Sequence, residues 1–186
     1  MKKRIIFILT MILLGITNLP AQSYQGRWFA DEKTMEELGL DLDILEDAGL
    51  KDFSLLLNIS KGSIKVDLLF SGKEEGITYY MIYSTPGTYS RKGNKVHARF
   101  DPDKAKFRVS NLKSEDKETK KLLKIEEFKK EMLKSLSMMI REEMGEDAKS
   151  LSYMAELFQE FTIERVSDDR LTINVDGDKL RFHRAQ

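Results

Sequence analysis

Alternation of apolar and polar residues in short runs, separated by turn residues, constrains the fold of this chain more than any other feature. Successive side chains of a β-strand point to opposite faces, so each run predicts a strand with one apolar face. The first three runs are 53–59, 64–70 and 77–83. Lys61-Gly62 predicts a tight hairpin between the first two, and Thr85-Pro86-Gly87 predicts an interruption of the third.

The same period continues toward the C-terminus. The later runs are 96–100, 105–109, 161–163, 171–175 and 180–182. Asp176-Gly177 between the last two is a strong hairpin signal. With Tyr24 to Ala30 as a first strand, about nine strands are expected, most of them joined to their sequence neighbours in an antiparallel meander.

Two segments break the alternation. Residues 31–52 hold nine acids and two bases, a net charge of −7, and predict two short helices. Asp31 suits the N-cap of the first, which Gly39 ends, and Asp41 or Asp43 suits the second, which Gly49 ends. Residues 112–158 predict a helical pair, broken at Gly145 and resumed at Asp147, because apolar residues recur three and four apart. These stripes are Ile125, Phe128, Met132, Leu136, Met139 and Ile140, then Leu151, Met154 and Phe158.

Residues 1–21 have the layout of a secretory signal peptide. Lys2, Lys3 and Arg4 precede a mostly apolar run, and Pro20-Ala21 precede the expected mature N-terminus at Gln22. The apolar run is shorter than the roughly 20 residues that span a bilayer as a helix, so cleavage is favoured over an uncleaved anchor. We expect a periplasmic or secreted protein with one domain, residues 22–186, and no membrane insertion after cleavage. It is not expected to be a lipoprotein, since the chain has no Cys.

The composition of the mature chain excludes several classes of function. Its 28 bases and 31 acids give a net charge of −3, without the basic surface that nucleic-acid backbones require. The absence of Cys excludes disulfides, thiol catalysis and Cys-ligated metal centres.

Closure of the meander follows from the cost of its edges. An open meander leaves unpaired N–H and C=O groups on its first and last strands, and a closed barrel removes both edges. Closure brings the last strand antiparallel to the first and places Arg184 near Trp28. A guanidinium over an indole ring contributes about 0.5–2 kcal/mol, so this pair is expected to plug the closed end of the barrel.

These residues resemble the lipocalin-like, or calycin, superfamily, in particular its small exported bacterial members. Gly26-Arg27-Trp28 opens the first strand after a signal peptide, a meander follows, and Arg184 lies near the end of the last strand. The resemblance covers residues 24–111 and 159–185. It implies a mainly β protein, an antiparallel up-and-down barrel with a helical pair inserted before the last strands, whose interior holds a small apolar ligand. Gly26, Trp28 and Arg184 would then be the structural plug.

The helices set this chain apart from the family. Residues 31–52 are similar to the lid of fatty-acid-binding proteins, whereas the insertion at 112–158 fits neither those proteins nor ordinary lipocalins. The helical insertion therefore leaves three interpretations of the barrel mouth: a ligand pocket, a plug or a docking surface.

No catalytic or metal-binding motif is present. His97 and His183 lack metal-ligand spacing and alternate out of phase with the apolar residues, so they are expected to face solvent. The acidic pairs at 101 and 103, 168 and 169, and 176 and 178 occupy turn positions. We expect a non-catalytic protein without metal or cofactor, while a hydrolase or isomerase with two carboxylates at the barrel mouth stays open as an alternative.

Two functions compete. The first is binding of a small apolar ligand in the barrel, by residues among Trp28, Val66, Tyr79, Met81, Phe107 and Ile173. The acidic segment 31–52 would repel anions at the mouth, which favours a neutral or cationic ligand. The second is a structural or protein-interaction module of the cell envelope. In it the barrel is filled, and the Met-rich residues 132–154 bind a protein partner or a second copy.

Overall fold

The structure is a computed structural model that describes residues 23–38, 51–74, 76–144 and 147–185. The predicted signal peptide and the second short helix predicted between residues 41 and 49 lie outside the described residues. In chain order the elements are β1 (Gly26–Ala30), α2 (Glu32–Glu37), β2 (Lys51–Ser60), β3 (Ser63–Glu74), β4 (Ile77–Lys92), β5 (Lys95–Phe100), the 3₁₀ turn η1 (Pro102–Lys104), β6 (Lys106–Ser114), α4 (Lys117–Leu122), α5 (Glu126–Met144), α6 (Asp147–Glu156), β7 (Glu160–Val166), β8 (Arg170–Val175) and β9 (Asp178–Arg184).

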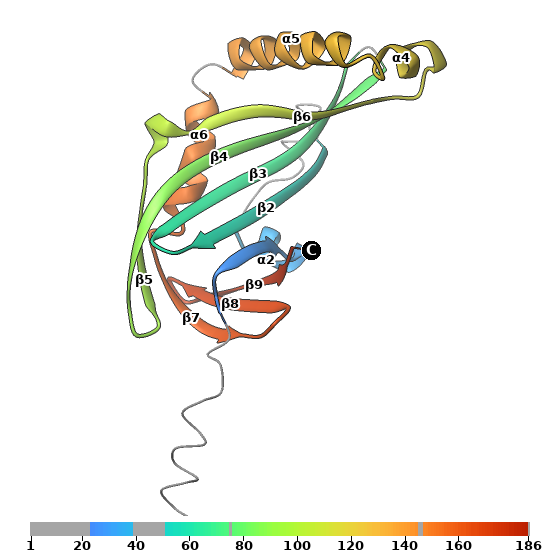
Figure 1. Cartoon of the computed structure of the whole chain (residues 1–186). Helices are drawn as coiled ribbons and strands as arrows, with labels where there is room; N and C mark the ends of the chain where they lie inside the picture. The colour runs from blue at the N-terminus through green and yellow to red at the C-terminus, as the bar shows by residue number, and fades with distance from the viewer. Residues whose placement is uncertain (1–22, 39–50, 75, 145–146, 186) are drawn as a thin grey trace, which may run out of the picture.

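Eight strands close into an antiparallel barrel, as the alternation predicted (Figure 1). The ring runs β1, β2, β3, β4, β5, β7, β8 and β9, and β9 pairs back with β1 through Trp28 opposite Arg184. The junction of β5 with β7, where Val96 lies opposite Phe161, completes the ring across the helical insertion. The chain is thus mainly β, with helices inserted before the last three strands.

β6 departs from the predicted sequential meander. Among the described strands it pairs with β4 and not with β5, so it lies outside the ring. β4 is long enough for both partners on one edge: β6 pairs along residues 77–84 and β5 along residues 87–92. The barrel wall is therefore extended at one end by an open sheet of β2, β3, β4 and β6, which Figure 1 shows rising toward α5.

The predicted interruption at Thr85-Pro86-Gly87 is wrong, because β4 runs unbroken from Ile77 to Lys92. Proline lacks an N–H and is tolerated in a strand only where no ladder bond is needed. Pro86 falls between the stretches of β4 that pair with β6 and with β5. Its carbonyl accepts a hydrogen bond from the Asp101 N–H at 2.9 Å on that edge, so the missing donor faces a gap in the ladder.

The helices differ in extent from the prediction. The first short helix forms as expected, with the Asp31 carboxylate accepting from the Thr34 N–H at 2.8 Å. The later insertion begins only after β6, at Ser114, and holds the short helix α4, capped by Asp116, before the predicted pair. Ile125 precedes α5 and is 52% exposed, so it does not belong to the buried stripe.

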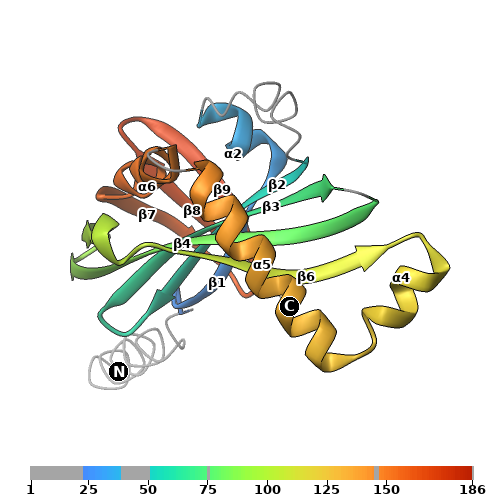
Figure 2. The ribbon, with the colours of Figure 1, turned by 90° about the horizontal axis from the view of Figure 1, so that it is seen from above.

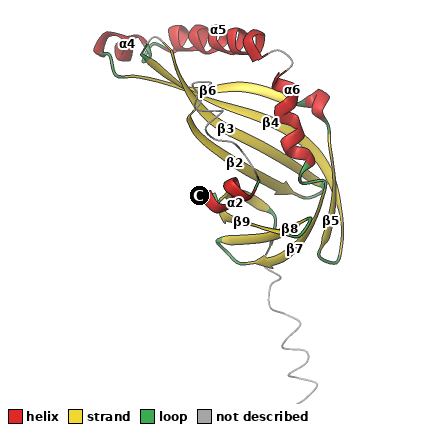
Figure 3. Ribbon diagram, turned by 180° about the vertical axis from the view of Figure 1, so that it is seen from behind, coloured by secondary structure: helices red, strands yellow, loops and turns green. Residues whose placement is uncertain are grey.

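The insertion packs onto the barrel instead of standing apart from it. α6 contacts β3, β4 and β5, beside which it stands in Figure 3. Phe158 follows α6 and is completely buried, with its ring centre 6.4 Å from that of Phe182 on β9. The barrel core therefore includes side chains from the insertion as well as from the strands.

Candidate functional site

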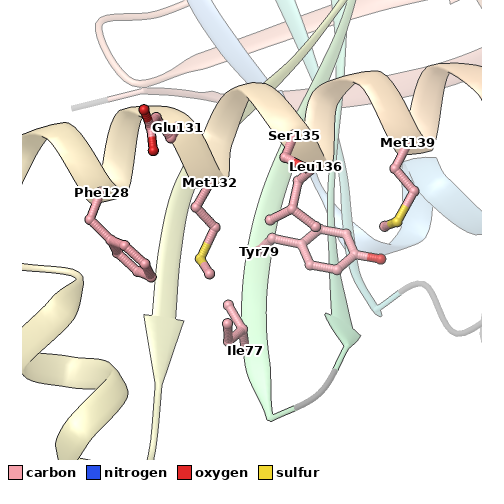
Figure 4. A pocket seen from close by; sticks show the side chains of 8 residues that line it. All are labelled: Ile77, Tyr79, Phe128, Glu131, Met132, Ser135, Leu136 and Met139. Atoms are coloured by element: carbon pink, nitrogen blue, oxygen red, sulfur yellow. The ribbon is translucent and has the colours of Figure 1, made fainter.

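A groove of about 380 Å³ lies between α5 and the start of β4 (Figure 4). Ile77 and Tyr79 of β4 form one wall, and Figure 4 shows the side chains of Phe128, Met132 and Leu136 extending from α5 toward them. The full lining is Ile77, Tyr79, Phe128, Glu131, Met132, Ser135, Leu136 and Met139.

The sequence of α5 explains how these side chains come together. Phe128, Met132, Leu136 and Met139 are spaced four, four and three residues apart, so they share one face of the helix. Met138 falls on another face and is 51% exposed. Glu126 and Glu127 occupy the first turn, where their charge interacts favourably with the helix dipole. Seen from above in Figure 2, α5 crosses the sheet, and it contacts β6 beneath it.

The groove is a continuation of the barrel's inner face. Ile77 and Tyr79 alternate in phase with Met81 and Tyr83, which are buried in the core, so all four point to the same side of β4. Gly72 lies opposite Tyr79 on β3. A Cβ atom at Gly72 would lie 2.5 Å from the Tyr79 ring, so glycine is what allows this ring to lie against the strand. The open end of the barrel is thus covered by α5, with the groove between.

The lining of the groove is chemically simple. Six of its eight residues are apolar or aromatic, Ser135 is polar and uncharged, and Glu131 is the one ionisable residue besides the phenol of Tyr79. Apolar surfaces with a few polar groups are typical of sites for small organic molecules. The carboxylate of Glu131 disfavours an anion in the groove.

The residues predicted to bind ligand are spread over different depths. Val66, Met81 and Ile173 are at most 1% exposed and pack in the barrel core. Tyr79 lies in the groove beneath α5, and Phe107 lines a separate cleft with Lys106 and Arg108. Of the five, the structure places only Tyr79 in the groove. Four of the six α5 residues in the lining, Phe128, Met132, Leu136 and Met139, belong to the apolar stripe that the sequence predicts, whereas Glu131 and Ser135 do not, and nothing in the spacing identifies β4 as the partner of the stripe.

The three residues predicted to form a plug are brought together at the other end of the barrel. The Arg184 guanidinium lies 4.2 Å from the centre of the Trp28 ring, and the Trp28 Nε1–H donates to the Tyr24 carbonyl at 2.8 Å. A Cβ atom at Gly26 would lie 2.7 Å from Nη1 of Arg184. Glycine at this position therefore leaves space for the guanidinium.

A tyrosine pair lies near this plug. The Tyr24 and Tyr89 hydroxyl oxygens are 3.1 Å apart, and the Arg91 guanidinium lies 4.3 Å from the centre of the Tyr24 ring. Burial opposes ionisation of both phenols. For Tyr24 the hydrogen bonds from Tyr89 and Arg91 and the charge of Arg91 outweigh burial and lower the pKa, whereas burial and the Tyr24 hydroxyl raise the pKa of Tyr89.

Both histidines face solvent, as their position in the alternation predicted. Nδ1 of His97 lies 3.6 Å from a Glu160 carboxylate oxygen, and His183 stacks on Phe29 with ring centres 5.7 Å apart. Within the described ranges, no group of three or more His, Cys, Asp or Glu residues could hold a metal ion. No helix in the same part of the chain is long and apolar enough to cross a membrane.

The fold and the groove define a closed antiparallel β-barrel with an apolar groove at its helix-covered end. No protein-family model matches this sequence, and no curated protein is significantly similar to it.

Proposed function

We propose that this chain is an exported, non-catalytic barrel protein of the lipocalin-like type that binds a small apolar ligand at the mouth of its barrel. The observation that carries the proposal is the groove in which Ile77 and Tyr79 face the apolar stripe of α5. Its volume of about 380 Å³ is within the usual range for small-molecule sites, roughly 300–1,000 Å³. We place the ligand at the mouth of the barrel because the side chains in the middle of the barrel are buried in the core.

Two features support the lipocalin-like, or calycin, assignment. The ring closes between the first and last strands, and the Trp28–Arg184 contact seals that closure at one end. The other end, under α5, is where the inner face of β4 remains partly exposed. A barrel that is sealed at one end and partly open at the other can admit a ligand through the open end.

The lining favours an uncharged or cationic ligand. Burial of apolar ligand surface contributes about 25 cal/mol per Å², and the lining has no cation to balance a ligand carboxylate. Glu131 would add repulsion to that cost. Alcohols, esters and alkyl amines of moderate length are therefore expected to bind better than fatty acids.

A calorimetric titration tests this proposal with three ligands of equal chain length: 1-decanol, decylamine and decanoate. We expect 1-decanol and decylamine to bind about tenfold more tightly than decanoate. Leu136→Glu places a second carboxylate in the groove and should lower the affinity for 1-decanol about tenfold or more. Met138→Glu on the exposed face of the same helix is the matched control and should leave the affinity unchanged. Equal losses in both variants, or tighter binding of decanoate, would count against the proposal.

A second candidate function rests on where exposed apolar side chains occur. Among the described residues the exposed large hydrophobic side chains all lie in the helical insertion or next to it: Leu122, Ile125, Met138, Tyr153 and Leu157. These side chains are spread along the insertion and do not by themselves form one patch, so the observation that favours this candidate is their confinement to the insertion and the residue next to it. In this alternative the insertion binds a protein partner or a second copy of the chain. Native mass spectrometry distinguishes the two candidates, because a dimer that Met138→Glu dissociates supports the second, and a monomer with retained small molecule supports the first.

A further inference from the structure

A second concave site lies on the outer face of β7, β8 and β9, on the opposite side of the barrel wall from its core. It is a cleft of about 400 Å³ whose polar lining comprises Asp31, Arg165, Arg170, Thr172, Arg181 and His183. The buried neighbours of these residues, such as Leu171 and Phe182, point inward, so the alternation of β8 and β9 turns the basic side chains outward. The strands labelled β7, β8 and β9 lie side by side in Figure 1.

The strand register gathers the positive charges of this cleft. Arg165, Thr172 and Arg181 lie opposite one another across the three strands, which places the Thr172 hydroxyl between two arginines. Arg170 and His183 form the neighbouring pair on the same face. Thr172 separates Arg165 from Arg181 and the arginines are exposed, so their mutual repulsion is screened by solvent, while an anion bound among them would be attracted by the guanidinium groups of Arg165, Arg170 and Arg181.

The acids near the cleft balance only part of this charge. The Glu164 carboxylate is 3.2 Å from the Lys179 ammonium, and Asp169 is 3.9 Å from Nε of Arg170. Asp31 also lines the cleft, where one of its carboxylate oxygens accepts from the Thr34 N–H at the start of α2. Neither Arg165 nor Arg181 forms an ion pair with any carboxylate of the described residues.

We propose that this cleft binds a phosphate group through the guanidinium groups of Arg165 and Arg181. The planar guanidinium donates two parallel hydrogen bonds to a phosphate, a geometry that lysine lacks. The Thr172 hydroxyl between them supplies a third donor, and Arg170 adds positive charge from the next position of β8. This site is independent of the apolar groove, since none of its residues belongs to the groove lining.

NMR titration tests the site with inorganic phosphate and with glycerol 3-phosphate. Backbone amide resonances of Arg165, Thr172 and Arg181 should shift in a saturable manner, and the double variant Arg165→Gln/Arg181→Gln should lower the affinity about tenfold or more. The control Lys106→Gln/Arg108→Gln removes the same charge from the outer face of β6 and should leave the affinity unchanged. Absence of saturable shifts at millimolar phosphate would overturn the proposal. Equal losses in the two double variants would overturn it as well, because they would show general attraction of anions to basic side chains.

A flotation assay then identifies the source of the phosphate group. Vesicles of phosphatidylcholine containing phosphatidic acid should recruit the protein if the phosphate belongs to a lipid headgroup, and this recruitment should be lost in Arg165→Gln/Arg181→Gln. Binding of glycerol 3-phosphate without recruitment to these vesicles assigns the site to a soluble phosphomonoester. Recruitment that both double variants reduce equally would contradict a specific site.

Discussion

Replacing Trp28 with alanine is expected to lower the free energy of unfolding by about 3–5 kcal/mol, among the largest effects of any single substitution in this chain. The side chain is completely buried, and its removal leaves a cavity in the core at the sealed end of the barrel. It also removes the ring beneath Arg184 and the donor to the Tyr24 carbonyl. Guanidinium-induced unfolding followed by far-ultraviolet circular dichroism measures the change without depending on tryptophan fluorescence.

Two further variants separate the contributions at Trp28. Trp28→Phe keeps most of the apolar volume but loses the 2.8 Å hydrogen bond to Tyr24, so it should cost less than Trp28→Ala. Arg27→Ala alters an exposed neighbour on the same strand and should have little effect. If Trp28→Ala were as stable as Arg27→Ala, the sealed end would not stabilise the barrel as we infer.

Phe158→Ala is expected to have a comparable effect, about 3–5 kcal/mol, although Phe158 lies outside every strand. Its side chain is completely buried and packs on Phe182 of β9, so the variant leaves a cavity where the insertion meets the barrel. The same denaturation measurement applies. Leu157→Ala, at a neighbouring position that is 41% exposed, is the matched control and should change stability by far less.

The outcome of Phe158→Ala also decides how the insertion relates to the barrel. A single cooperative transition at lower denaturant concentration would show that helices and barrel unfold together. An early transition with loss of helical signal alone, at wild-type barrel stability, would contradict the packing described here.

The closed barrel was predictable from the sequence because alternation reports directly which side chains face the core. Leu55, Leu57 and Ile59 alternate in the sequence and are all buried, and the Lys61-Gly62 turn joins β2 to β3 as expected. Because unpaired N–H and C=O groups on edge strands are unfavourable, the last strand is expected to pair with the first, and this pairing places Arg184 opposite Trp28. These steps depend only on the local alternation pattern and on the free-energy cost of unpaired strand edges. They require no knowledge of which distant residues are in contact.

The pairing of β6 was not predictable by the same means. Alternation determines the face of a residue but not the neighbour of a strand, and one edge of β4 accommodates two partners in succession. The sequence predicts an interruption at Thr85-Pro86-Gly87 because proline lacks the N–H that a strand ladder normally uses. The gap between β6 and β5 that tolerates it exists only in the assembled sheet.

The groove shows the same limit. Val66 and Tyr79 are equivalent in the sequence pattern, since both are inward-facing residues of long strands. Val66 lies in the core, whereas Tyr79 lies two residues from the start of its strand, beneath α5. Depth along the barrel follows from how strands are staggered and from where the helices cover them, and neither is encoded in a two-residue period. The apolar stripe of α5 could be predicted from the sequence, but its packing partner, the start of β4, could not.

The most direct test of the proposed binding site is a titration of the protein, labelled with ¹³C in its methionine methyl groups, with 1-decanol. The chain carries reporters at distinct places: Met81 in the core, Met132 and Met139 in the groove, and Met138 on the exposed face of α5. We predict that the methyl resonances of Met132 and Met139 shift in a saturable manner while those of Met81 and Met138 do not. A shift of Met81 alone would place the ligand inside the barrel, and a shift of Met138 alone would place it on the outer surface of the helix; either result would contradict binding beneath α5.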